Sequence, residues 1–165
     1  MAVVNVLSSS LTNRDTQPVQ LNNARINGSP VKHARAVFTI TNGDSAASTY
    51  RLFELPSNAL PVSIRVSAPD IGTTTTFNVG LYDTTKNGGL AVSAALFAAP
   101  FVVNVGPYAK VEIGYTVTTL ANAEKTIWQL LGLAADSTKN YDFVATLVGA
   151  ADATGLVLIE VDYTI

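Results

Sequence analysis

The stretch that decides the fold is RLFELPSNALPVSIRVSAPDIGTTTTFNVGLYD, which occupies positions 51–83. Apolar and polar residues alternate over positions 62–67 and again over 77–81. Such alternation is typical of a β-strand with one buried face. Prolines at 56 and 61 interrupt the pattern, and a proline cannot donate to a strand ladder. The stretch therefore predicts short strands at 50–55, 62–67 and 77–81.

The same pattern continues on both sides of this stretch. Residues 31–40 alternate, which predicts a half-buried strand. Near the C-terminus, residues 141–147 and 157–163 alternate in the same way. They are predicted to form a hairpin around the loop 149–155.

The middle of the chain is less regular. Residues 101–105 and 111–117 predict two strands, joined by a tight turn at Gly106-Pro107. Residues 90–99 are small and fit either a short helix or a packed loop.

One stretch, 123–133, predicts a helix. Ile127, Leu130 and Leu131 share one helix face, and Asn122 is the predicted N-cap. Short strands with one short helix indicate an all-β fold, an antiparallel β-sandwich of jelly-roll-like type.

Residues 30–165 are predicted to form this sandwich as a single domain, and the polar residues 1–29 an N-terminal arm or edge strand. The arm and the strand after it are basic. Residues 1–35 contain Arg14, Arg25, Lys32 and Arg35 against one aspartate, so the acidic charge lies in the rest of the chain. These four side chains are the candidate partner-binding residues, for an acidic surface. Ordinary scatter of surface charge is the alternative explanation.

Composition excludes several classes of protein. Of 165 residues, 48% are apolar and 13% charged, which excludes charge-driven disorder. The chain has no cysteine and one histidine, so thiolate zinc sites and multi-histidine metal sites are excluded. A net charge of −2 argues against nucleic-acid binding. No apolar stretch predicts a membrane span or a signal peptide, so we expect synthesis in a cytoplasm without export.

Residues that could carry catalysis are few. His33 has no carboxylate nearby in sequence, so a catalytic triad would depend on tertiary contacts. Glu160 and Asp162 share one strand face about 7 Å apart, as glycosidase carboxylates do, but an exposed strand face also explains them. We predict no enzymatic activity and no cofactor.

Two weaker binding possibilities remain. Asp136, Asp142 and Asp152 could hold a hard cation, although their spacing matches no calcium loop, and no metal site is predicted. Trp128, with Tyr141 and Phe143, could stack on a sugar. The alternative for Trp128 is a core position that seats the helix on the sheet.

The surface is made of Ser, Thr, Asn and Ala rather than Lys and Glu. Short side chains lose little entropy when an interface covers them. This composition favours a protein held in a permanent assembly, although threonine-rich sandwiches are also common.

Several segments together resemble the auxiliary head proteins of tailed bacteriophages, the decoration or cement proteins. These are the quoted stretch 51–83, with its ending D-I-G-T-T-T-T-F-N-V-G-L-Y-D, the segment T-I-W-Q-L-L-G-L at 126–133, Y-D-F-V-A-T at 141–146 and the final V-L-I-E-V-D-Y-T-I. The resemblance covers residues 31–165 and leaves the arm outside it.

The resemblance implies a sandwich on the outside of a phage capsid, bound to the major capsid protein and to itself as a homodimer or homotrimer, with no active site. We expect the arm to lie across neighbouring capsid subunits. The alternatives are a carbohydrate-binding sandwich of a phage fibre or adhesin, with aromatic side chains as its platform, and, third, a hydrolase that uses Glu160 or Asp162.

Overall fold

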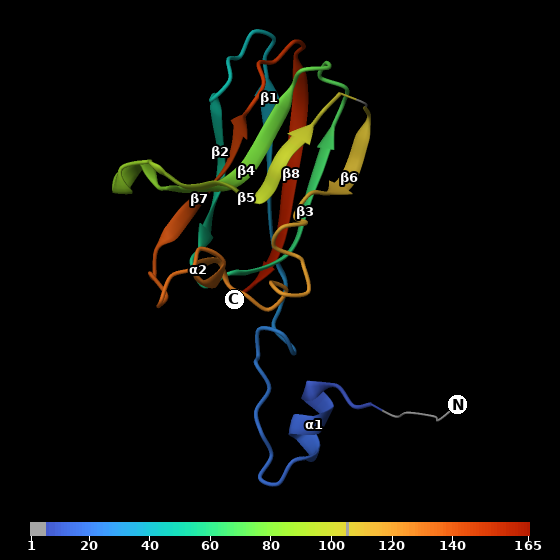
Figure 1. Cartoon of the computed structure of the whole chain (residues 1–165), viewed down its shortest axis with the longest axis vertical. Coiled ribbons are helices and arrows are strands. Elements are labelled where there is room, and N and C mark those ends of the chain that lie inside the picture. The colour runs from blue at the N-terminus through green and yellow to red at the C-terminus, as the bar shows by residue number, and fades with distance from the viewer. Residues whose placement is uncertain (1–5, 105) are drawn as a thin grey trace, which may run out of the picture.

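The computed structural model describes residues 6–104 and 106–165 and shows two β-sheets packed face to face (Figure 1). The strands are β1 (Lys32–Ile40), β2 (Thr49–Pro56), β3 (Leu60–Ala68), β4 (Thr76–Asp83), β5 (Ala91–Val102), β6 (Tyr108–Glu112), β7 (Asn140–Leu147) and β8 (Gly155–Thr164). One sheet has the order β1-β8-β3-β6 and the other β2-β7-β4-β5, and all pairings are antiparallel. Eight strands wound into two such sheets form a jelly roll, so the predicted antiparallel sandwich is confirmed.

The core lies between the two sheets and is centred on aromatic rings. Phe97 and Phe143 are fully buried, with ring centroids 5.1 Å apart, and Phe53 also stacks on Phe143, at 4.9 Å. Stacked aromatic pairs stabilise a core by about 0.5–1.5 kcal/mol beyond the area they bury. The inward faces of β1, β3, β4, β7 and β8 follow the alternation in the sequence, as the burial patterns of these strands show.

Two predicted hairpins are wrong. β7 pairs with β2 and β4, whereas β8 pairs with β1 and β3 in the other sheet. The turn at Gly106-Pro107 likewise joins β5 and β6, which belong to different sheets. Alternation fixes which face of a strand is buried but carries no information about its neighbour.

Val105, the end of the predicted strand 101–105, lies outside the described residues. The second predicted strand, 111–117, is shorter than expected, because residues 113–117 leave the sheet as a turn.

Residues 90–99, for which helix and loop were both open, belong mostly to strand β5. This strand pairs with β4, and the two backbones approach very closely at Gly80. A Cβ placed on Gly80 would lie 2.1 Å from the carbonyl oxygen of Ser93 and 2.4 Å from the carbonyl carbon of Ala94. The missing side chain at Gly80 is therefore what lets β5 pair with β4 here.

The predicted helix is shorter than expected. α2 spans Ile127–Leu130, and its N-cap is Thr126 rather than Asn122. The backbone N–H of Thr126 donates to Gln129 Oε1 at 2.9 Å, and the N–H of Ile127 donates to Ala59 O at 2.8 Å. These bonds fix the start of α2 against the connection between β2 and β3, so the residues before Thr126 form turns instead.

Two further short helices were not predicted. They are α1 (Ser9–Asp15) in the arm and the 3-10 helix η1 (Thr85–Asn87) in the connection between β4 and β5. Within the described parts of the chain, every helix falls short of the length and apolarity needed to cross a membrane.

Candidate functional site

The arm extends beyond the end of the sandwich from which β1 starts (Figure 1). Its described residues, 6–29, fold back on themselves through polar side chains. Asn13 Nδ2 donates to Asn22 Oδ1 at 2.8 Å, and Asn27 Nδ2 donates to Ser10 Oγ at 3.1 Å. Hydrogen bonds between amide and hydroxyl groups thus hold the arm in its folded-back shape.

The apolar side chains of the arm face outward instead. α1 has no buried residue, and Leu21 is 95% exposed. Other large apolar residues in the described part of the arm are also exposed, namely Val6, Leu7, Leu11, Val19 and Ile26. A short segment that exposes so much apolar surface is typical of a binding element.

Two hydrogen bonds attach the arm to the C-terminal end of β8. Thr164 Oγ1 donates to Arg25 O at 3.1 Å, and Ser29 Oγ donates to Ile165 O at 3.3 Å. The arm therefore starts from a defined point on the sandwich.

The four predicted partner-binding cations do not form one patch. Arg14 pairs with Asp15 in α1, at 2.7 Å. Arg25 lies near Asp136, where it helps to lower the pKa of that carboxyl, after the larger effects of hydrogen bonds from Ser57 and a backbone N–H. Lys32 and Arg35 are exposed on β1. Their role in partner binding stays a prediction.

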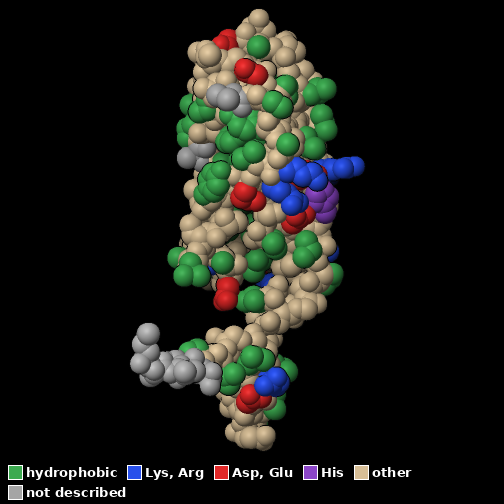
Figure 2. All heavy atoms as spheres, turned by 90° about the vertical axis from the view of Figure 1, so that its right-hand side faces the viewer, with side chains coloured by type: hydrophobic (Ala, Val, Ile, Leu, Met, Phe, Trp, Pro, Cys, Tyr) green, Lys and Arg blue, Asp and Glu red, His purple; other side chains and the backbone are tan. Residues whose placement is uncertain are grey.

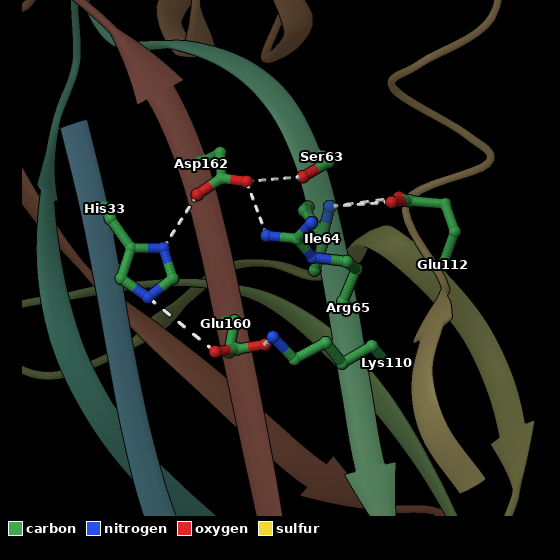
Figure 3. Close-up of polar contacts among 8 residues, drawn as sticks. All are labelled: His33, Ser63, Ile64, Arg65, Lys110, Glu112, Glu160 and Asp162. Atoms are coloured by element: carbon green, nitrogen blue, oxygen red, sulfur yellow. Dashed lines mark hydrogen bonds and ion pairs between the residues drawn. The ribbon is translucent and has the colours of Figure 1, made fainter. Parts of the chain in front are cut away.

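A charged cluster lies on the outer face of the sheet β1-β8-β3-β6 (Figure 3). We define it as His33, Ser63, Arg65, Lys110, Glu160 and Asp162. Strand pairing places Asp162 between His33 and Ser63. His33 Nδ1 donates to Asp162 Oδ1 at 2.7 Å, while Ser63 Oγ and Arg65 Nη2 donate to Oδ2 at 3.0 and 2.5 Å. Figure 2 shows the single histidine beside basic and acidic side chains on this side of the molecule.

Glu160 is the other carboxylate of the cluster and is only 5% exposed. Its Oε1 lies 3.7 Å from His33 Nε2, and its Oε2 lies 4.0 Å from Lys110 Nζ. The pairing of β8 places it beside Arg35 on one side and Arg65 on the other. The cluster thus links β1, β8, β3 and β6 by alternating charge.

The contacts of the cluster differ from those of a Ser-His-Asp triad. Ser63 contacts Asp162 and not the imidazole, so the order of contacts in a Ser-His-Asp triad is not formed. Both ring nitrogens of His33 face carboxylates, which leaves no nitrogen directed at a nucleophile.

The pKa of Asp162 lies below the ordinary value of an aspartate. Burial alone would raise this pKa, but hydrogen bonds from His33 and Ser63 and the charge of Arg65 outweigh burial. Because the pKa is lower in the folded state than in the unfolded state, ionised Asp162 stabilises the fold above about pH 4, and this contribution disappears as the pH falls through the folded-state pKa.

We therefore expect Asp162→Asn to be less stable than the unmodified chain by about 1–3 kcal/mol at pH 7. The difference should shrink between about pH 5 and pH 2, because the unmodified chain loses the contribution of the ionised Asp162 there. Urea unfolding at a series of pH values measures it. A difference that stays constant down to pH 2 would show that this carboxylate does not stabilise the fold through its charge.

The three aspartates considered as cation ligands are held by different partners. Asp142 pairs with Arg51, and Asp152 accepts hydrogen bonds from the backbone N–H of Thr73 and from Thr75 Oγ1. Over residues 6–104 and 106–165, no group of three acidic or histidine side chains is arranged to hold a metal ion. The structure therefore does not bring Asp136, Asp142 and Asp152 together.

The three aromatic side chains considered as a platform for a sugar do not lie together on the surface. Tyr141 and Phe143 are 3% and 0% exposed and belong to the core of the sandwich. Trp128 is half-buried. The fully buried residue of α2 is Ile127, so Ile127 rather than Trp128 anchors this helix.

Sequence reasoning missed Ser63, Arg65 and Lys110 as members of the cluster. The alternation in the sequence places Ser63 and Arg65 on an outer face, which is the available signal. Only the pairing of β3 with β8 and β6 brings them to His33 and Glu160.

No protein-family model and no curated protein matches this chain. Solved structures are similar in fold. A chain in the capsid of Ralstonia phage GP4 superposes with a TM-score of 0.59 at 18% identity, over 82% of this chain and 84% of that chain. A chain in the cyanophage Pam1 capsid asymmetric unit superposes with a TM-score of 0.53 at 20% identity, over 83% of this chain and 86% of that chain. At these identities the comparisons show a shared fold.

Proposed function

We propose that this chain is a virion structural protein that decorates the outside of a phage capsid, binds the major capsid protein and stabilises the shell. The observation that carries the proposal is the arm, which is held together by hydrogen bonds between polar side chains while its large apolar side chains are exposed. The similarity in fold to chains of two phage capsid structures supports the same assignment.

The exposed apolar residues of the arm supply the binding free energy in this proposal. Burying one aliphatic side chain contributes about 1.5–3 kcal/mol. A capsid surface that covers Leu11 and Leu21 would therefore hold each copy with several kcal/mol, less the cost of association. Lys32 and Arg35, exposed on β1 where the arm joins the sandwich, would face acidic groups of the shell.

Self-association completes the proposal. A homodimer or homotrimer places two or three arms on one shell, and every further arm then binds at a high effective concentration. The surface of short side chains and the net charge of −2 oppose such association little. The protein acts by binding alone, with no enzymatic step.

Co-sedimentation tests this function. Capsids of the phage that carries this chain are assembled without it, and purified protein is then added in increasing amounts. We expect saturable binding at a fixed number of copies per shell, and decorated shells that withstand a higher temperature before they release DNA. Absence of sedimentation with intact shells at micromolar protein would contradict the proposal.

A further inference from the structure

We propose that a polar groove at the end of β2 and β7 binds a neutral oligosaccharide. Pro56, the last residue of β2, pairs with Asn140, the first residue of β7. Two hollows, one of about 270 Å³ and one of about 200 Å³, share Asn140 among their lining residues. Each is smaller than the range of about 300–1,000 Å³ that is typical of small-molecule sites, so the proposed ligand is an extended one that contacts both hollows.

The polar groups of the groove are held in place by contacts within the chain. Asn140 Nδ2 donates to Glu54 Oε2 at 3.1 Å, which fixes the orientation of the shared amide. In the second hollow, Asp136 accepts hydrogen bonds from Ser57 Oγ and from the backbone N–H of Thr138. A site whose groups are already oriented loses little entropy when a ligand binds.

Arg51 anchors the connection between β4 and β5, which supplies part of the lining of the first hollow. Its guanidinium donates to the carbonyl oxygens of Asp83 and Gly89, at 3.0 and 2.6 Å, and pairs with Asp142 at 2.5 Å. The contacts with Asp83 and Gly89 hold the two ends of the connection between β4 and β5. The same connection supplies Thr84, Lys86 and Asn87 to the hollow.

The chemistry of the lining selects the ligand class. Glu54 and Asp136 balance Lys86 and Lys139, so the groove favours neither an anion nor a cation. Amides, hydroxyls and carboxylates offer donors and acceptors side by side, which matches the neighbouring hydroxyls of a sugar ring. Pro56 is the one apolar residue among the lining residues of these two hollows, which disfavours a lipid.

This groove is distinct from the aromatic platform considered for a sugar, and the proposal does not rest on capsid binding. The backbone N–H of Trp128 donates to Ser57 O at 3.0 Å, so the chain's one tryptophan lies beside the groove. Its fluorescence is a convenient second reporter of binding.

The test titrates the full chain with maltohexaose, chitohexaose and a galactose hexasaccharide, using isothermal calorimetry and tryptophan fluorescence. Inorganic phosphate is the anionic rival. The variant is Asn140→Ala, and the matched control is Asn42→Ala, an exposed asparagine in the turn between β1 and β2. Thermal unfolding of both variants checks the fold.

We expect at least one hexasaccharide to bind with a millimolar or lower Kd, and Asn140→Ala to weaken it at least about tenfold while Asn42→Ala binds like the unmodified chain. The proposal is overturned by the absence of saccharide binding up to about 10 mM across the three probes, a concentration that still reveals weak sites. Equal binding to Asn140→Ala, or binding of phosphate alone, overturns it as well. None of these outcomes bears on capsid binding.

Discussion

A chain that carries Leu11→Asp and Leu21→Asp is expected to bind capsids at least about 100-fold more weakly than the unmodified chain while its sandwich stays folded. Both leucines are exposed in the arm, so their substitution removes no core contact. In the proposed complex both are buried. Leu21, which is 95% exposed, would lose about 1.5–3 kcal/mol and Leu11, which is 39% exposed, a smaller part of that. Each new carboxylate must also be desolvated at the interface, so together the two changes correspond to about a hundredfold or larger rise in Kd. Sedimentation with capsids over a series of protein concentrations measures both dissociation constants.

The control for this variant is Leu156→Asp. Leu156 is 60% exposed at the start of β8, whereas the arm is attached at the other end of this strand, so the same chemical change is made away from the arm. We expect its capsid affinity to stay within about threefold of the unmodified chain, a change below 1 kcal/mol. If the arm variant bound as tightly as this control, the capsid contact would have to lie on the sandwich.

Gly80→Ala is expected to destabilise the sandwich by about 3 kcal/mol or more, which is beyond the usual cost of one added methyl group in a core. The new Cβ would meet the backbone of Ser93 and Ala94, at 2.1 and 2.4 Å. A flexible side chain could change its rotamer to relieve this overlap, but backbone atoms cannot. The backbone of β5 would therefore have to move away from β4. Urea unfolding at neutral pH gives the loss of stability.

Gly43→Ala provides the comparison. A Cβ on Gly43 meets nothing within 4 Å, and the position has a φ of +90°. Its cost is the left-handed backbone strain alone, about 1–2 kcal/mol. Equal stabilities for Gly80→Ala and Gly43→Ala would mean that β4 and β5 are not packed as described.

The buried faces of the strands could be read from the sequence because the side-chain period of a strand is two residues. Ile64 and Val66 are fully buried in β3, as their alternation predicts. Val62 follows the same alternation but is 46% exposed. The pairing of β3 with β8 shifts its register between Pro61 and Ser63, and such a shift moves a side chain to the other face.

Strand partners and the charged cluster could not be predicted in this way. His33 and Asp162 are 129 positions apart, and each was placed on an outer face by alternation alone. Their contact requires β8 to lie beside β1, whereas the sequence suggested a hairpin of β8 with β7. An alternating strand fits beside any other, so local pattern does not select its neighbour.

The arm was predicted from its polar composition, but α1 and the outward-facing apolar residues were not. Ser9–Asp15 has no apolar periodicity and no buried residue, so the signal used for amphipathic helices is missing. The groove at Asn140 was missed because its lining comes from three connections that are distant in the sequence.

Electron cryomicroscopy of capsids assembled without this chain and then incubated with it tests the central claim most directly. The account predicts added density for a jelly-roll sandwich on the outer surface of the shell, with the density of the arm continuing onto major capsid protein subunits. Capsids that show no added density at saturating protein would contradict it. So would sandwiches whose contact with the shell leaves the arm in solvent.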